Sequence, residues 1–174
     1  MPAIMAKAGI MATKARKNDP GRVILDITES RKRTNELSYL AHHDMLTGLA
    51  NRREFESRME RLLDDARLSG RRHIMFYLDL DRFKVVNDAC GHAAGDKVLK
   101  LLSEEFKKHL RKDDCIGRLG GDEFGVLLVN CNVKSAQAVG EKMRQDIEGF
   151  EFECNGNIYK LGVSIGVVAI TKNA

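Results

Sequence analysis

The sequence lacks the patterns of a membrane protein, an exported protein and a zinc protein. No apolar run is long enough to cross a membrane, and the basic N-terminal stretch has no continuous apolar core like that of a signal peptide. The four cysteines form no Cys-x-x-Cys pair, so we predict structural thiols in a reducing compartment and not a zinc site or a disulfide framework. We therefore expect a globular, cytoplasmic chain that makes no membrane contact of its own.

An excess of positive charge is missing from most of the chain. Residues 1–36 hold eight Lys or Arg and four Asp or Glu, whereas residues 37–174 hold 21 of each, so the net charge of +4 belongs to the N-terminal part. A nucleic-acid-binding surface would need a basic stripe, so we expect no nucleic-acid partner. With 174 residues, of which 43% are hydrophobic, the chain can form one domain plus an extension.

Composition and turn signals divide the chain into three parts. Residues 1–22 are predicted to be a leader, a tag remnant or a disordered segment. Residues 23–43 are predicted to be a linker and a signalling helix, because apolar residues lie at helical spacing between 37 and 41. The phrase at 26–29, followed by a charged helix, resembles the exit of a PAS sensor domain into its output module; an arbitrary surface helix is the alternative. Residues 44–174 are predicted to be the main domain.

Hydrophobic patterns from residue 73 onward predict the order strand, helix, strand, strand, helix, strand. A continuous apolar run over 73–81 predicts a strand buried on both faces. Two runs, 115–119 and 124–129, flank a Gly-Gly pair and predict a β-hairpin. The other expected elements are a helix from the N-cap Asn51 to Ser69, a helix after an N-cap at Asp96, a helix over 136–147, a hairpin turn at Asn155 and Gly156, and a strand over 162–170. This order predicts an α/β (α+β) fold with a ferredoxin-like β-α-β-β-α-β core, an extra N-terminal helix and a β-hairpin arm.

Acidic residues stand at the end of the first strand and at the tip of the central hairpin. Asp79 ends the apolar run, and Asp122 and Glu123 follow the Gly-Gly pair. Since these two places lie side by side in such a sheet, we expect the carboxylates to converge; the alternative for the hairpin acids is a solvated polar turn. Hard carboxylates without Cys or His partners suit Mg²⁺ or Mn²⁺, and two such ions support in-line displacement at phosphorus. The fold and the acids together predict nucleotidyl transfer.

Residues 42–44, His-His-Asp, are a second group of possible metal ligands. Three consecutive side chains do not converge on one face of a helix or a strand. We therefore predict a structural turn before the helix at Asn51 and not a metal site.

Four motifs, at residues 44–52, 78–88, 91–96 and 120–124, resemble in order and interval the GGDEF family of diguanylate cyclases. Members of this family condense two GTP molecules into cyclic di-GMP, a bacterial second messenger. The resemblance implies a nucleotidyl-cyclase-like fold, bound Mg²⁺ or Mn²⁺, and a homodimer in which each domain holds one GTP. It also implies a bacterial, cytoplasmic parent protein. From the PAS-like phrase at 26–29 we expect an upstream sensor domain in that protein, and upstream domains are the place where a membrane tether would lie.

The resemblance assigns roles to the acids and to two residues beside the phosphates. Asp79 and Asp122 match the metal ligands, with the Leu80 backbone carbonyl assisting. Glu123 matches the second signature acid, which serves as a metal ligand or deprotonates the 3′-hydroxyl, and the sequence leaves both roles open. Phe83 and Lys84 match residues beside the phosphates, and Lys84 is also a candidate catalytic residue.

Two further residues match those that read the guanine edge. Asn87 and Asp96 occupy these positions, and a carboxylate suits guanine because adenine lacks the adjacent N1 and N2 donors. The alternatives are a polar helix end for Asn87 and an N-cap for Asp96.

Arg111 and Asp114 match the inhibitory site at which the family binds its product, because their distance from Gly120 fits. The planar guanidinium of Arg111 can donate paired hydrogen bonds to guanine or phosphate. Asp114 is expected to accept a hydrogen bond from that guanidinium or from the guanine base. On its own an Arg-x-x-Asp pair is a solvated helix end with little energetic weight.

The family pattern continues after the strand at 162–170 with a helix, Ala-Asp-x-Ala-Leu-Tyr-x-Ala-Lys, and a closing strand, which this sequence does not contain. The lysine of that helix would contact the triphosphate. We therefore expect this piece to be weakly active or inactive, and a catalytically silent module that senses GTP or cyclic di-GMP is the alternative to the enzyme.

Overall fold

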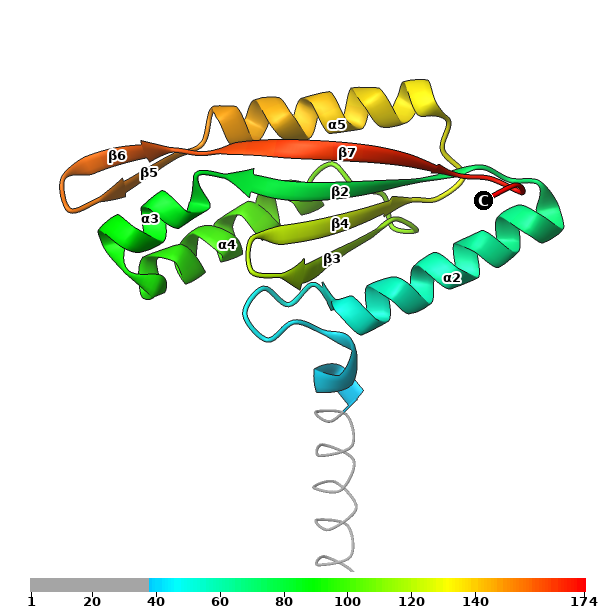
Figure 1. Ribbon diagram of the computed structural model, residues 1–174, viewed down its shortest axis with the longest axis horizontal. Helices are drawn as coiled ribbons and strands as arrows, with labels where there is room; N and C mark the ends of the chain where they lie inside the picture. The colour runs from blue at the N-terminus through cyan, green and yellow to red at the C-terminus, as the bar shows by residue number, and fades with distance from the viewer. Residues whose placement is uncertain (1–37) are drawn as a thin grey trace, which may run out of the picture. The chain divides into compact units, whose positions relative to one another are not determined.

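The computed structural model describes residues 38–174 (Figure 1). The predictions for residues 1–22 and 23–37 lie outside this range. Residues 38–42 are helical, and a turn leads from them into the domain. The strands are β1 (Ala50–Asn51), β2 (His73–Asp81), β3 (Cys115–Gly120), β4 (Glu123–Leu128), β5 (Glu151–Cys154), β6 (Asn157–Lys160) and β7 (Gly162–Ile170). The helices are α2 (Arg52–Ser69), α3 (Phe83–Cys90), α4 (His92–Lys107) and α5 (Val133–Glu148).

Five strands form one sheet in the order β1-β3-β4-β2-β7. Strand β2 pairs antiparallel with β4 on one side and with β7 on the other. The two-residue strand β1 pairs parallel with β3. From β2 onward the chain follows the predicted β-α-β-β-α-β order, with the first crossover made of two helices, so the predicted fold class is confirmed.

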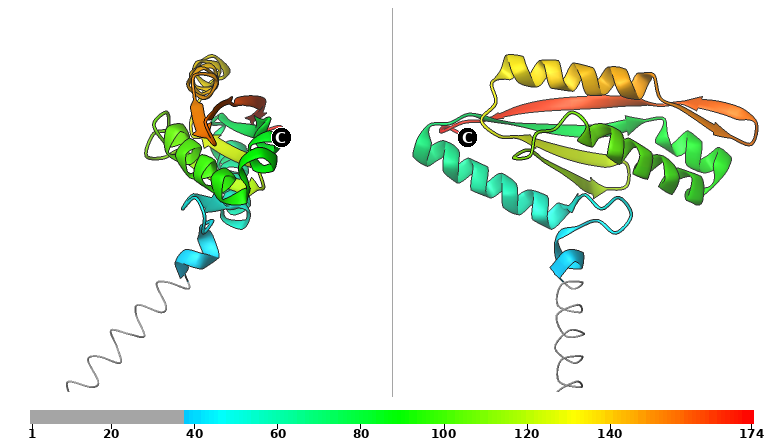
Figure 2. Two further views of the ribbon diagram at one scale, coloured as in Figure 1. Left: turned by 90° about the vertical axis from the view of Figure 1, so that its left-hand side faces the viewer. Right: turned by 180° about the vertical axis from the view of Figure 1, so that it is seen from behind.

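One face of the sheet carries the main core. Ile74, Phe76, Leu78 and Leu80 of β2 point to this face and are at most 2% exposed. They pack with the buried faces of α4 and α5 (Figure 2). This alternation in β2 fixes which side chains point to the opposite face, and those include the acids.

Helix α2 covers only part of the opposite face. It packs there through Phe55 and Ala66, and Met75 of β2 lies against this second cluster. Tyr77 is 39% exposed, and Asp79 is also exposed. The prediction that the 73–81 strand is buried on both faces is therefore wrong for its C-terminal half, because α2 does not extend over it.

Local signals explain most helix boundaries. Asn51 caps α2 as predicted, since its side chain accepts a hydrogen bond of 2.9 Å from the backbone N–H of Glu54. The predicted N-cap at Asp96 is wrong, because α4 begins at His92 and Asp96 lies inside it. Gly91, with φ of 82°, allows the chain to turn directly from α3 into α4.

The hairpin β5–β6 forms a separate two-stranded arm that turns at Asn155 and Gly156, as predicted. Figures 1 and 2 show it beside α3, beyond the end of the main sheet. Cys154 at the end of β5 forms a disulfide with Cys90 at the end of α3. The prediction that the cysteines are unpaired thiols is therefore wrong for these two, whereas Cys115 and Cys131 are free.

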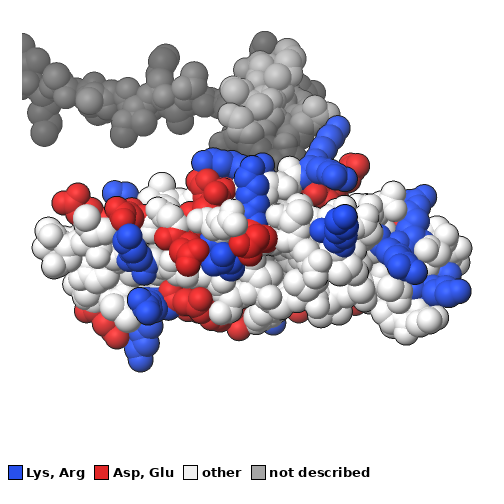
Figure 3. Space-filling view, turned by 90° about the horizontal axis from the view of Figure 1, so that it is seen from above, with Lys and Arg blue, Asp and Glu red and all other residues white. Residues whose placement is uncertain are grey.

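Charges of both signs are intermixed on the surface that is seen from above in Figure 1 (Figure 3). On α5, for example, Arg144 forms ion pairs of 2.8 Å with Glu141 and 2.9 Å with Glu148. Each helix in the range 38–174 is too short or too polar to cross a bilayer.

Candidate functional site

The acidic end of β2 lies beside the turn between β3 and β4. Asp79 and Glu123 are direct partners in the β2–β4 register. The backbone N–H of Leu80 donates a hydrogen bond of 3.4 Å to the carbonyl oxygen of Asp122. The structure thus brings the strand end and the hairpin tip together, as the sequence predicts.

The carboxylates at this edge repel one another. Loss of hydration raises the pKa of Asp79, and the negative charges of Asp122, Asp81 and Glu123 raise it further. Within residues 38–174, no three His, Cys, Asp or Glu side chains are arranged to hold a metal ion as they stand. The donor set is nevertheless of the hard oxygen type that divalent Mg²⁺ or Mn²⁺ prefers, and a bound cation would relieve this repulsion.

Tyr77 and Arg52, two residues that the sequence did not single out, lie beside Glu123. A hydrogen bond to Glu123 raises the pKa of the Tyr77 hydroxyl. The Nη2 of Arg52 lies 3.5 Å from the Oε2 of Glu123, and its Nε donates to the carbonyl oxygen of Leu119 at 2.7 Å. Tyr77 precedes Asp79 by two residues and so lies on the same strand face, which is the signal by which it could have been found.

The side chain of Arg118 stabilises the turn at the tip of the β3–β4 hairpin. Its Nε and Nη2 donate hydrogen bonds of 3.0 and 2.8 Å to the carbonyl oxygen of Gly121, whose φ of 52° suits glycine. Its Nη1 lies 3.4 Å from both carboxylate oxygens of Asp44. Asp44 also accepts hydrogen bonds from the backbone and hydroxyl of Thr47, which agrees with the predicted turn at 42–44.

The ionic state of Asp44 follows from these contacts. Burial favours its neutral form, but the hydrogen bonds from Thr47 and the charge of Arg118 outweigh burial and lower the pKa of this carboxyl. The Arg118 side chain that supports the hairpin tip is therefore paired with an ionised Asp44 carboxylate.

Helices α3 and α4 meet at the two residues predicted to read guanine. The Oδ1 atom of Asn87 is buried and accepts no hydrogen bond from any residue in the range 38–174. It lies against Gly95, where a β-carbon would clash with it and would stand 2.9 Å from the Asn87 Cγ. Asp96 follows Gly95 and is exposed. A buried acceptor without a partner indicates a place for a donor from a ligand.

The residues predicted to lie beside the phosphates begin α3. Phe83 is buried, with 7% of its surface exposed, and it helps to seat the helix on the core. Lys84 follows on the first turn and is exposed. Of these two residues, Lys84 is therefore the one that presents its side chain to solvent.

Arg111 and Asp114 line a small cavity of about 60 Å³ together with residues of α5 and its preceding loop. The carboxylate of Asp114 accepts backbone hydrogen bonds of 2.9 Å from Arg111 and from Val129. The expected contact between Asp114 and the Arg111 fork is therefore replaced by a contact to the Arg111 backbone. No ion pair joins the Arg111 guanidinium to another residue in the range 38–174.

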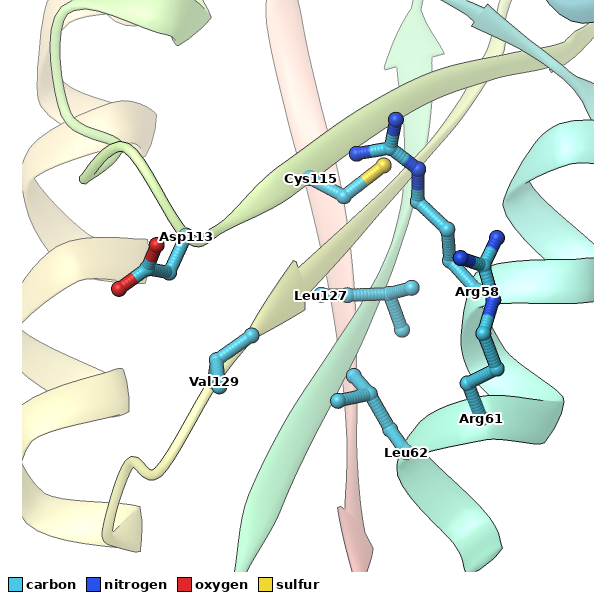
Figure 4. A pocket seen from close by; sticks show the side chains of 7 residues that line it. All are labelled: Arg58, Arg61, Leu62, Asp113, Cys115, Leu127 and Val129. Atoms are coloured by element: carbon cyan, nitrogen blue, oxygen red, sulfur yellow. The ribbon is translucent and has the colours of Figure 1, made fainter. Parts of the chain in front are cut away.

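A second cavity, of about 180 Å³, separates α2 from the β3–β4 hairpin (Figure 4). Figure 4 shows Arg58 and Arg61 reaching over it from α2, with the guanidinium of Arg58 beside Cys115. Burial raises the pKa of the Cys115 thiol. The sequence did not predict this cavity, and its lining includes none of the predicted site residues.

Comparisons with known proteins agree on one family. The family model described as "Diguanylate cyclase, GGDEF domain" matches residues 41–174. The probable diguanylate cyclase DgcE of Escherichia coli (strain K12) is 45% identical over 151 residues, which cover 87% of this chain and 14% of that protein. The cyclic di-GMP phosphodiesterase PdeB of Shewanella oneidensis is 35% identical over 175 residues, which cover 96% of this chain and 19% of that protein.

A solved structure has the same fold. The coiled coil and GGDEF domain of DgcB from Caulobacter crescentus, in complex with c-di-GMP, gives a TM-score of 0.81 at 22% identity, covering 88% of this chain and 82% of that one. The chain spans less than a fifth of the length of the two curated relatives named above.

Proposed function

Because this chain belongs to the GGDEF domain family of diguanylate cyclases, we propose that its domain condenses two GTP molecules into cyclic di-GMP and two pyrophosphates. The observation that carries this proposal is the register pair of Asp79 and Glu123 beside Asp122, at an edge where the carboxylates raise the pKa of Asp79. Such crowding is favourable only where the site binds positive charge.

The acids are the candidate ligands of Mg²⁺ or Mn²⁺. Asp79, Asp122 and the Leu80 carbonyl would hold the ion, with Glu123 as a further ligand. A bound divalent cation supplies neutralisation of the triphosphate and of the leaving pyrophosphate. The oxygen-only donor set and the mutual repulsion of the carboxylates support this assignment.

The remaining residues bind and orient GTP. The orphan Oδ1 of Asn87 accepts from the guanine edge, and Asp96 accepts from the N1 and N2 donors. Lys84, exposed on the first turn of α3, supplies positive charge for the phosphates, and Phe83 fixes that turn to the core. In this proposal α3 and α4 therefore select GTP and position it in the site.

The reaction joins two half-sites in a homodimer. The 3′-oxygen of one GTP bonds to the α-phosphorus of the other as the bond to pyrophosphate breaks. The 3′-oxygen of the second GTP bonds to the α-phosphorus of the first in the same way, and a second pyrophosphate leaves. Glu123 takes up the 3′-hydroxyl proton or binds the cation. Arg52 pairs with its carboxylate at 3.5 Å and so helps to orient it beside Asp79.

The product is proposed to bind at Arg111 and Asp114 and to inhibit turnover. The cavity there accommodates part of a ligand, and the guanidinium of Arg111 offers a planar fork to guanine or phosphate. Asp114 supports the turn through two backbone hydrogen bonds and thereby holds Arg111 in place.

The parent protein is proposed to be a bacterial, cytoplasmic signalling protein whose upstream PAS-like domain controls this output domain. A second function, a silent module that binds GTP or cyclic di-GMP, is favoured by one observation: a relative named as a phosphodiesterase matches 96% of this chain. In that relative the name describes hydrolysis of cyclic di-GMP and not its synthesis.

Incubation of the full-length parent protein with GTP and Mg²⁺, followed by mass spectrometry of the nucleotides, tests the proposal. Formation of cyclic di-GMP by the native protein but not by an Asp122→Asn variant supports the enzyme. Binding of GTP or cyclic di-GMP without any product, measured by calorimetry, supports the silent module.

A further inference from the structure

The β5–β6 arm is joined to the C-terminal end of α3. Cys154, the last residue of β5, forms a disulfide with Cys90, the last residue of α3, and their Cα atoms are 6.3 Å apart. The Nδ2 of Asn155 donates a hydrogen bond of 3.4 Å to the carbonyl oxygen of Ala89. Two consecutive residues of the arm thus contact two consecutive residues of the helix.

The arm also contacts α4. Phe152 of β5 is 7% exposed and belongs to the same core cluster as Val86 of α3 and Val98 of α4. The Nζ of Lys97 on α4 lies 6.0 Å from the centre of the Phe152 ring. The arm is therefore packed against both helices.

These two helices carry the proposed guanine contacts. Asn87 lies one helical turn before Cys90, and Asp96 directly precedes Lys97. The buried, unpartnered Oδ1 of Asn87 keeps its place only while α3 stays close to Gly95 of α4. A bond that fixes the end of α3 consequently limits how far this acceptor can move.

We propose that Cys90 and Cys154 form a reversible oxidative modification site that raises the affinity of the domain for GTP when the two thiols are joined. This inference rests on the proposed function of α3 and α4. In a reducing compartment, where we expect the parent protein, persistent disulfides are rare and those that form are usually catalytic or redox-sensing. Both cysteines are half-buried, so a small reagent reaches them, whereas Cys115 is buried.

The oxidant is a small-molecule disulfide such as oxidised glutathione. The thiolate of one cysteine attacks a glutathione sulfur, one glutathione thiolate leaves, and a mixed disulfide forms. The thiolate of the second cysteine then attacks the protein sulfur and releases the second glutathione. The protein loses two electrons and two protons, and one glutathione disulfide becomes two glutathione thiols.

The joined form is expected to bind GTP more tightly because α3 is already ordered. In the reduced form the nucleotide must restrict α3 and the arm on binding, and this ordering weakens the observed affinity. Oxidation restricts α3 and the arm before GTP binds.

The test measures GTP affinity by calorimetry, with Mg²⁺ present, after equilibration with oxidised or reduced glutathione. We expect the oxidised protein to bind at least about fivefold more tightly, at the lower end of typical couplings between sites. Peptide mass mapping of the same samples identifies the disulfide partners. Cys90→Ser and Cys154→Ser should show the reduced-form affinity under both conditions, whereas Cys131→Ser, another half-buried cysteine, should keep the response to oxidation.

Equal or weaker GTP binding by the oxidised protein overturns the inference, as does a mass map in which Cys90 and Cys154 stay unpaired with oxidised glutathione. The comparison of the two states of the unsubstituted protein does not depend on any variant folding. Absence of GTP binding in every form, with the disulfide present, overturns the proposed function and this role together. A GTP affinity that is the same in the oxidised and the reduced protein overturns only the role of the disulfide.

Discussion

Arg118 donates two hydrogen bonds to the carbonyl oxygen of Gly121, three residues ahead, and in this way supports the turn that presents Asp122 and Glu123. The same guanidinium pairs with Asp44, so the loop before α2 is joined to the hairpin tip. The side chains of this pair are only 16% and 23% exposed, which separates it from the surface ion pairs of the helices.

Replacement of Arg118 should destabilise the fold. Arg118→Ala removes the hydrogen bonds to Gly121 and leaves the partly buried Asp44 without its cation, so we expect a loss of about 2 to 3 kcal/mol in the free energy of unfolding. Urea denaturation measures this loss. Arg67→Ala is the control, because Arg67 forms an ion pair with Asp64 and a hydrogen bond of 3.0 Å to the carbonyl oxygen of Ala174, both exposed, and its loss should change stability by less than about 0.5 kcal/mol. Equal effects of the two substitutions would refute a special role for Arg118.

Acid should weaken the fold through Asp44. The pKa of Asp44 is lowered in the folded state, so the unfolded chain binds this proton more readily and the contribution is present at neutral pH. It is lost as the pH falls below about 4 and through the lowered pKa. Asp44→Asn should therefore flatten the decline in stability between pH 6 and pH 3, measured by urea denaturation, whereas the exposed Asp64→Asn should keep it. Parallel profiles for Asp44→Asn and the unsubstituted protein would contradict this prediction.

Asp122→Asn should abolish product formation and weaken metal binding, since a neutral amide is a much poorer ligand for a hard divalent cation. Calorimetric titration with Mn²⁺ measures the metal, and mass spectrometry measures cyclic di-GMP. The exposed Asp113→Asn carries the same chemical change outside the acidic edge and should leave metal binding unchanged. Near-native turnover by Asp122→Asn would remove Asp122 from the metal site.

Asp96→Ala should relax the choice of GTP over ATP, because it removes the acceptor for the guanine N1 and N2 donors. We expect the ratio of GTP to ATP affinity to fall about ten- to a hundredfold, as for the loss of a hydrogen bond to a charged group. Lys100→Ala, one turn further along α4 and exposed, is the control and should keep the ratio. Undiminished exclusion of ATP by Asp96→Ala would leave Asp96 as an ordinary exposed residue of α4.

Arg111→Ala should remove tight binding of cyclic di-GMP and leave GTP turnover unchanged or raised, because Arg111 lies before β3 and away from the acidic edge. Loss of a bidentate charged contact should cost about 1.5 to 3 kcal/mol, or roughly ten- to a hundredfold in affinity. Calorimetry with cyclic di-GMP compares this variant with Lys112→Ala, its exposed neighbour. If both variants bind as the unsubstituted protein does, residues 111–114 are a solvated turn.

The sequence predicted those parts of the fold that depend on local patterns. Asn51 as a cap, the turn at Asn155 and Gly156, and the glycine-centred hairpin are local signals, and the structure has all three. The boundary of α4 was wrong because Gly91 joins two helices directly, and a cap at Asp96 was plausible only if the preceding residues formed a loop.

Features that depend on contacts between distant segments were the ones missed. The apolar run of β2 does not reveal that α2 stops covering the sheet before Tyr77, and so the exposure of that side chain was not predicted. The pairing of Cys90 with Cys154, 64 residues apart, requires the position of the arm. Arg52 reaches Glu123 only because α2 begins beside the β3–β4 turn.

Helix design applied to α4 would damage the protein at residue 95. Propensity scales favour alanine over glycine inside a helix by about 1 kcal/mol, so Gly95→Ala would be among the first substitutions in a programme to raise thermal stability. The added methyl group would clash with the Asn87 carboxamide and displace it. Gly95→Ala would therefore move the side chain that we propose to recognise guanine, and libraries built on this scaffold should keep residue 95 as glycine.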